Sequence, residues 1–214
     1  MRLYEARQKA RFGGVFGEEN VFLTEAHRTL LTERTDSGAT VYALVRTAAY
    51  TYTDGVLLDV GGSYIPTALT FEFSGDGVYT LSEYWLPGDG SYFAPSIREK
   101  FPESVQTDAI SNLAFAEELS IAALRSAQRR FGITDFTPPE VTAARPPELA
   151  VGSAPDWAEY FRVTDDADGE ISLENAYVWD VMVDLSAAGR YPLQISVQDR
   201  SGNQTRAEFE IAVK

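Results

Sequence analysis

The sequence predicts an α+β N-terminal domain, an antiparallel sheet with helices, followed by an all-β sandwich. Three observations support this fold class. Strand patterns separated by turn clusters fill the first hundred residues, one long helical pattern follows, and a proline-rich segment then precedes a series of short strand patterns. We place the domain boundary in the proline-rich segment, which gives domains of residues 1–137 and 138–214.

The sheet of the first domain is predicted from apolar-polar alternation between turn signals. Thr35–Gly38 is a turn cluster, and Asp54-Gly55 is a strong hairpin signal. We expect a short strand to stop at Gly61-Gly62 and a new one to begin at Thr67. Hairpins in succession build an antiparallel meander. The expected strands are Val21–Arg34, Val41–Thr53, Val56–Val60, Thr67–Phe73 and Val78–Trp85.

Helices are predicted at three places in the first domain. Residues 3–12 indicate a short basic helix, and residues 96–101 indicate another, stopped by Pro102. The longest helical period covers residues 106–131, with a cap at Thr107 or Asp108 and an end at Gly132. We expect this helix to pack on the sheet.

The second domain begins in a segment with two Pro-Pro pairs, at Pro138-Pro139 and Pro146-Pro147. Such a segment is an extended connector or an edge strand. Beyond it, the apolar residues of 205–213 share one face and Glu208 and Glu210 share the other. The other expected strands are Phe161–Thr164, Val181–Leu185 and Tyr191–Val197.

Charge and composition exclude several classes of function. The chain carries 32 acidic and 18 basic residues, a net charge of −14, which opposes binding to nucleic acid or to an anionic membrane surface. It contains no cysteine, which excludes disulfides, thiolate metal sites and cysteine catalysis. No apolar run is long enough to span a membrane. No signal peptide is visible, and Met1 is either the native start or the start that follows a removed signal.

The C-terminal sequence resembles the immunoglobulin-like repeats of bacterial surface proteins. The residues that carry the resemblance are an acidic turn and a strand-turn pattern. This resemblance implies an immunoglobulin-like sandwich that acts as a spacer or adhesion module outside the cell. The matching residues are Asp165, Asp168, Gly169, Gly189, Tyr191, Val197, Asp199, Gly202 and Asn203.

The N-terminal sequence resembles a segment appended to BlaR-type membrane metallopeptidases and to uncharacterised secreted proteins of Firmicutes. The residues that carry it are Gly62–Phe71 and Leu81–Pro102. This resemblance implies a place outside the membrane, in a Gram-positive bacterium. The metal-binding helix motif of the peptidase is absent from the sequence, so it does not imply peptidase activity.

The common catalytic sets are missing. His27 is the single histidine, no G-x-S-x-G elbow or phosphate-binding loop accompanies it, and we interpret it as a structural residue. A hydrolase of extracellular polymers remains an alternative, with Glu72, Glu83, Asp89 or His27 as acid or base.

A ligand groove is the functional hypothesis for the first domain. Tyr84, Trp85, Tyr92 and Glu83 combine aromatic rings with a carboxylate, a mixture that suits stacking against a carbohydrate or a peptide. Arg98 is the fifth candidate ligand-binding residue. The structural alternative, which we prefer, is a loop and helix that close the sheet edge, with Arg98 paired to a carboxylate.

Calcium is the one cofactor that the sequence suggests. Asp165, Asp166, Asp168 and Asp199 provide oxygen ligands, although the spacing departs from an EF-hand loop at Thr164 and Asn175. The alternative, which we prefer, is a turn in which these aspartates bind their own backbone, without any cofactor.

These observations predict a non-catalytic, secreted or cell-surface protein that binds or senses a ligand. The expected partner is a cell-wall glycan, a peptide or another surface protein, not nucleic acid, and the chain itself does not insert into a membrane. The alternatives are the hydrolase and a structural spacer or assembly subunit.

Overall fold

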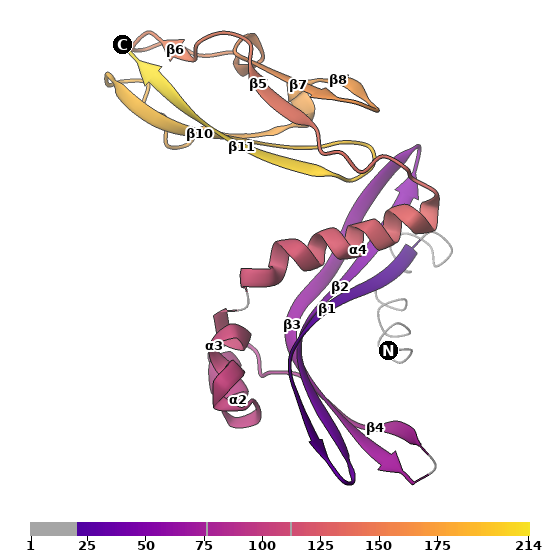
Figure 1. Ribbon diagram of the computed structural model, residues 1–214. Coiled ribbons are helices and arrows are strands. Elements are labelled where there is room, and N and C mark those ends of the chain that lie inside the picture. The colour runs from indigo at the N-terminus through magenta and orange to yellow at the C-terminus, as the bar shows by residue number, and fades with distance from the viewer. Residues whose placement is uncertain (1–20, 76, 112) are drawn as a thin grey trace. The chain divides into compact units, whose positions relative to one another are not determined.

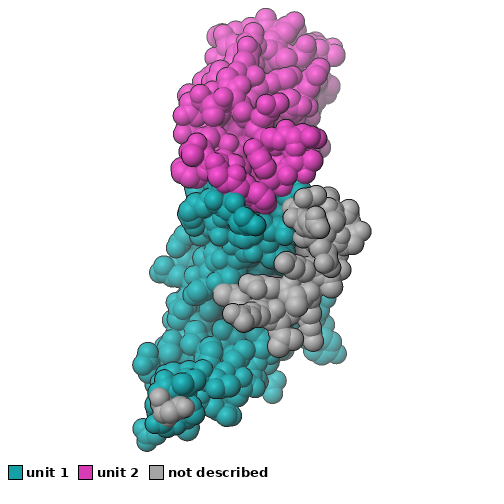
Figure 2. All heavy atoms as spheres, turned by 90° about the vertical axis from the view of Figure 1, so that its right-hand side faces the viewer, with its two compact units in different colours: residues 1–51, 59–130 teal, residues 52–58, 131–214 magenta. Residues whose placement is uncertain are grey.

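A computed structural model describes residues 21–75, 77–111 and 113–214. The helix predicted at residues 3–12 lies outside the described residues. The fold is rich in strands, with a few helices and mainly antiparallel sheets, as the sequence predicted (Figure 1). Figure 2 colours two compact units, one with residues 21–51 and 59–130, the other with Tyr52–Leu58 and Phe131–Lys214.

The first unit is built on a four-stranded sheet in the order β1-β2-β3-β4. Asp54 and Gly55, at φ of 53° and 77°, connect β2 to β3 in the left-handed conformation that a tight hairpin requires. This confirms the predicted hairpin turn. The strands are β1 (Val21–Thr35), β2 (Gly38–Thr53), β3 (Val56–Ser74) and β4 (Val78–Trp85).

The two strands predicted on either side of Gly61-Gly62 form a single strand, β3, so this prediction was wrong. A Cβ atom at Gly62 would lie 2.0 Å from the backbone oxygen of Thr47, so glycine here permits close strand approach and does not end the strand. Pro66 also fits within β3, because β4 pairs with β3 only from Ala68 onward. The missing N–H group of Pro66 therefore removes no hydrogen bond to β4.

Three helices follow the sheet, α2 (Phe93–Lys100), α3 (Glu103–Ser111) and α4 (Ala116–Phe131). The predicted continuous helix over residues 106–131 was therefore wrong, and its expected cap at Thr107 or Asp108 lies inside α3. Val105 and Ala109 are buried in α3, whereas Leu119 begins the buried stripe of α4. Ten residues from Ala109 to Leu119 fall roughly 80° short of three full turns, so one straight helix could not bury both stripes.

One face of the sheet packs against these helices. Phe101 packs on Tyr42 of β2 and on Trp85 of β4, with ring centroids 5.0 and 5.7 Å apart. On β1, Arg28 lies over the ring of Phe115 and 3.9 Å from Glu118 at the start of α4. The core cluster of this face is Tyr42, Ala68, Ile97, Phe101, Val105 and Ala109.

The second unit contains two small sheets, in the orders β6-β11-β10-β9 and β5-β7-β8. Phe161 of β7 packs on Phe209 of β11 with ring centroids 4.5 Å apart, which joins the sheets in one core. The strands are β5 (Glu140–Ala143), β6 (Glu148–Leu149), β7 (Phe161–Asp165), β8 (Gly169–Ile171), β9 (Tyr177–Trp179), β10 (Gly189–Gln198) and β11 (Gln204–Val213).

The predicted alternation in β11 is confirmed, since Ile211 and Val213 are buried and Glu208 and Glu210 are exposed. The proline-rich segment contributes β5 and β6, and both are edge strands, one of its two predicted forms. The predicted strand Val181–Leu185 does not form. Instead, the backbone carbonyl of Asp180 accepts from the N–H of Val183, and the side chain of Asp184 accepts from the N–H of Ser186. Such turns compete with strand pairing.

No helix among the described residues is long and apolar enough to cross a membrane.

The contact at Gly38 gives a test of the sheet. A Cβ atom there would lie 2.0 Å from the backbone oxygen of Phe71, so Gly38→Ala should lower the free energy of unfolding by about 2 kcal/mol. Gly75→Ala is the matched control, because no atom lies within 4 Å of its Cβ position. Urea denaturation of both variants measures the difference, and equal midpoints would contradict the close approach.

Candidate functional site

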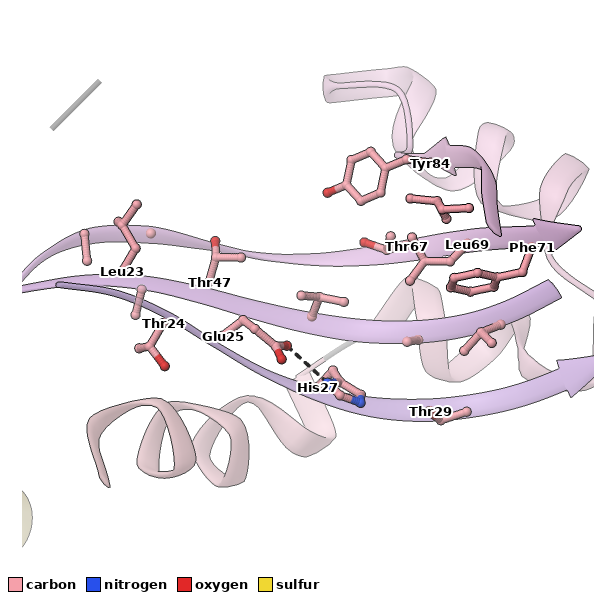
Figure 3. Close-up of a pocket in the computed structure, with 17 residues that line it drawn as sticks. Leu23, Thr24, Glu25, His27, Thr29, Thr47, Thr67, Leu69, Phe71 and Tyr84 are labelled. Carbon is pink, nitrogen blue, oxygen red and sulfur yellow. Dashed lines mark hydrogen bonds and ion pairs between the residues drawn. The ribbon is translucent and has the colours of Figure 1, made fainter. Parts of the chain in front are cut away.

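The face of the sheet opposite the helices forms an apolar groove with a volume of about 470 Å³ (Figure 3). Side chains alternate along a strand, so the odd-numbered residues from Val41 to Ala49 of β2 and from Thr67 to Phe71 of β3 point into the groove, while Tyr42 and Ala68 point to the helices. The groove is lined by Leu23, Thr24, Glu25, His27, Thr29, Val41, Ala43, Val45, Thr47, Ala48, Ala49, Gly62, Thr67, Leu69, Phe71, Leu81 and Tyr84.

Small side chains on the central strand create the hollow. Ala43, Thr47 and Ala49 lie on the groove face of β2, and Gly62 of β3 lies beside Thr47. Leu69 and Phe71 project from β3 toward the same space (Figure 3). The groove therefore offers a ligand mainly methyl groups and aromatic rings, as small-molecule sites commonly do.

A β-bulge brings β4 into the groove. The pairing of β3 with β4 shifts between Thr70 and Phe71, so Leu81 and Tyr84, three residues apart, both line the groove. Without this extra residue in β4, strand alternation would place them on opposite faces.

A polar pair lies on the edge strand β1. Nδ1 of His27 lies 3.1 Å from a carboxylate oxygen of Glu25, the contact marked by the dashed line in Figure 3. The side chain of His27 is 55% exposed, and that of Glu25 is 25% exposed. This pair supplies a carboxylate acceptor and an imidazole to the margin of an otherwise apolar groove.

The predicted aromatic set is divided between the two faces of the sheet. Tyr84 lines the groove, but the adjacent Trp85 points to the helices and packs on Phe101. Tyr92 lies in a short 3-10 helix (Gly90–Tyr92) with 73% of its surface exposed, and it does not line the groove. Of the three aromatic residues, the structure brings one to the groove.

The predicted acidic and basic residues of this region also lie away from the groove. Glu83 shares the helix-covered face with Thr70, and its oxygens accept hydrogen bonds from Lys100 at 2.6 and 2.8 Å, which lower the pKa of Glu83. Arg98 makes no ion pair among the described residues; Lys100 provides the cation at this place. Asp89 binds the backbone N–H of Gly90.

The residues proposed for hydrolysis are divided between the two faces of the sheet. Glu72 lies on β3 two residues from Thr70, on the face of Glu83, whereas His27 points into the groove. His27 therefore cannot act together with Glu72 or Glu83 on one bound substrate.

The acidic residues predicted in the second unit have different roles. Oδ1 of Asp165 accepts hydrogen bonds from the backbone N–H groups of residues 167 and 168, which is the predicted aspartate turn. A carboxylate oxygen of Asp168 accepts from the backbone N–H of Arg200, and Asp166 accepts from the hydroxyl of Thr137.

A third carboxylate that the sequence did not indicate joins Asp165 and Asp199. Asp135 follows α4, and one oxygen from each of these three aspartates lies within 4.8 Å of the others. Asn203 donates its side-chain amide to Asp199 and to Asp135, at 2.7 and 3.3 Å. Three strands, β5 to β7, lie in the sequence between Asp135 and the end of β7. No short sequence motif could therefore have identified Asp135 as a member of this cluster.

Asp199 is the most deeply buried member, with 3% of its surface exposed. Its pKa is raised to about 6, chiefly because burial disfavours the charged carboxylate. The hydrogen bonds from Asn203 oppose this rise, and the charges of Asp135 and Asp165 add to it.

No protein-family model matches the chain, and no curated protein sequence is significantly similar to it.

The opposite placement of Tyr84 and Trp85 predicts different effects on stability. Trp85→Ala should lower the free energy of unfolding by about 3 kcal/mol, because the ring packs on Phe101 in the core. Tyr84→Ala should lower it by less than about 1 kcal/mol, because 47% of the residue is exposed. Urea denaturation measures both values. A larger loss for Tyr84→Ala would contradict the assignment of the two faces.

Proposed function

We propose that the protein is a non-catalytic binding protein whose sheet groove holds an apolar ligand of the acyl-chain type. The observation that carries this proposal is the groove itself, about 470 Å³ lined mainly by aliphatic and aromatic side chains. This volume falls in the range of about 300–1,000 Å³ that is usual for small-molecule sites.

The chemistry of the groove favours an acyl chain over a glycan or a peptide. The face of a sheet presents side chains, while the backbone groups of the inner strands β2 and β3 are directed to their neighbouring strands. A bound glycan or peptide would leave hydroxyl or amide groups without partners on this apolar surface, which costs free energy. A hydrocarbon chain has no such groups to satisfy.

The polar pair on β1 indicates the kind of head group. Glu25 and His27 lie at the margin of the groove, where a ligand that fills the apolar part would place its polar end. A hydroxyl group donates to Glu25, whereas a carboxylate would be repelled by it. A neutral ligand such as a long-chain alcohol therefore fits this margin best.

The second unit supports a presenting role in this proposal. Its two sheets joined by the contact of Phe161 with Phe209 are consistent with an immunoglobulin-like module. On this proposal the protein acts outside the cell or at its surface. The separation of His27 from Glu72 and Glu83 supports binding in preference to hydrolysis.

Val45→Lys tests the groove. The substitution places an ammonium group on the groove face of β2, so the affinity for an apolar ligand should fall by at least about tenfold. The probe is N-phenyl-1-naphthylamine, a neutral dye that fluoresces in apolar surroundings, displaced by dodecanol. Fluorescence titration gives the affinities, and thermal unfolding verifies that the variant is folded.

Val78→Lys is the matched control, because Val78 lies on β4, is 53% exposed and does not line the groove. It should bind the probe as the parent protein does. Absence of saturable binding in the parent protein would overturn the proposal, as would equal loss in both variants. Displacement by a peptidoglycan fragment or a peptide, but not by dodecanol, would instead assign the groove to that class of ligand.

A further inference from the structure

Three separate segments of the second unit bring a carboxylate to one place. Asp135 lies between α4 and β5, Asp165 ends β7, and Asp199 directly follows β10. One oxygen from each lies within 4.8 Å of the other two. Two oxygens that both bind one calcium ion at about 2.4 Å cannot be more than about 4.8 Å apart, so all three pairs satisfy this limit.

One carboxylate oxygen of this cluster is buried without a hydrogen-bond partner. Oδ1 of Asp165 accepts two backbone hydrogen bonds, but Oδ2 is inaccessible to solvent and has no hydrogen-bond partner among the described residues. An unpaired buried carboxylate oxygen is costly, and native proteins seldom leave one without a proton, a water molecule or a cation. This observation is independent of the number of acidic residues.

The negative charge of the cluster is not balanced by basic side chains. Among the described residues, no lysine, arginine or histidine forms an ion pair with Asp135, Asp165 or Asp199. Asp199 is 3% exposed, and burying it as an unpaired anion is unfavourable. A divalent cation would compensate all three carboxylates at once.

Asn203 orients two of the carboxylates. It is 1% exposed, and its side-chain amide contacts Asp199 and Asp135, while its backbone N–H binds Asp199 at 2.8 Å. The turn that contains it returns β10 to β11. Two of the three carboxylates are therefore held by the fold before any cation arrives, which reduces the cost of ordering them on binding.

We propose that Asp135, Asp165 and Asp199 bind a calcium ion, which ties the segment after α4 to the ends of β7 and β10. The ligands are oxygens only, which suits a hard cation and not zinc or copper. Calcium accepts irregular sets of six to eight oxygens, completed by water or backbone carbonyls, whereas magnesium demands a near-ideal octahedron. This site is independent of the groove.

The test uses the full chain, treated with EDTA and then titrated with calcium chloride. Isothermal calorimetry should show one site with a dissociation constant of roughly 0.1–1 mM, as for extracellular calcium modules. Calcium at 5 mM should raise the melting temperature by about 2–6 °C, because it binds only the folded state. Asp135→Asn and Asp165→Asn should each weaken binding by more than about tenfold.

Asp166→Asn is the matched control, because Asp166 is adjacent to Asp165 in sequence but outside the cluster of three. It should leave calcium binding unchanged. The absence of a calcium-dependent heat and melting shift in the parent protein would overturn the proposal and assign the cluster to a shared proton. Equal loss of binding in Asp166→Asn and Asp165→Asn would overturn it as well.

Discussion

Backbone hydrogen bonding between β1, β2 and β3 decides which side chains of the first unit meet the helices and which remain for the groove. The register pairs Val21 with Thr51 as far as Thr29 with Ala43, shifts by one residue in β1, and then continues from Leu31 with Tyr42 to Thr35 with Gly38. The alternation along β2 is therefore kept, while a bulge interrupts that of β1. A shift by one residue would exchange the two faces. The helix-covered core and the groove are thus both results of the alternation along β2.

The two faces of β2 differ in the size of their side chains. The larger ones lie under the helices, and the smaller ones line the groove. On β2 the helix-covered face carries the buried side chains Tyr42, Leu44 and Tyr50, whereas the groove face carries Ala43 and Ala49. Large residues fill the space beneath helices at the density of a protein interior. Small residues on the other face leave a hollow without loss of strand pairing, and the bulge in β4 adds the ring of Tyr84 to its wall.

The second unit combines an apolar core with a charged cluster near the ends of its strands. The contact of Phe161 with Phe209 holds the two sheets, and β7 and β10 then carry Asp165 and Asp199 from this core to their ends. The core therefore fixes the separation of the carboxylates. A cation at their meeting point would offset the cost of burying them, which apolar packing alone cannot do.

The sequence by itself determined the local elements. The Asp54-Gly55 hairpin, the alternation in β11 and the helix end at Gly132, at φ of 71°, depend on neighbouring residues, and the structure confirms each of them. The tertiary structure alone decided what distant residues do together. Gly62 lies within β3 because the backbone of Thr47 approaches it, and Asp135 meets two aspartates that are 30 and 64 positions later in the chain. Sequence patterns report local spacing, whereas these contacts arise only when the backbone folds segments together.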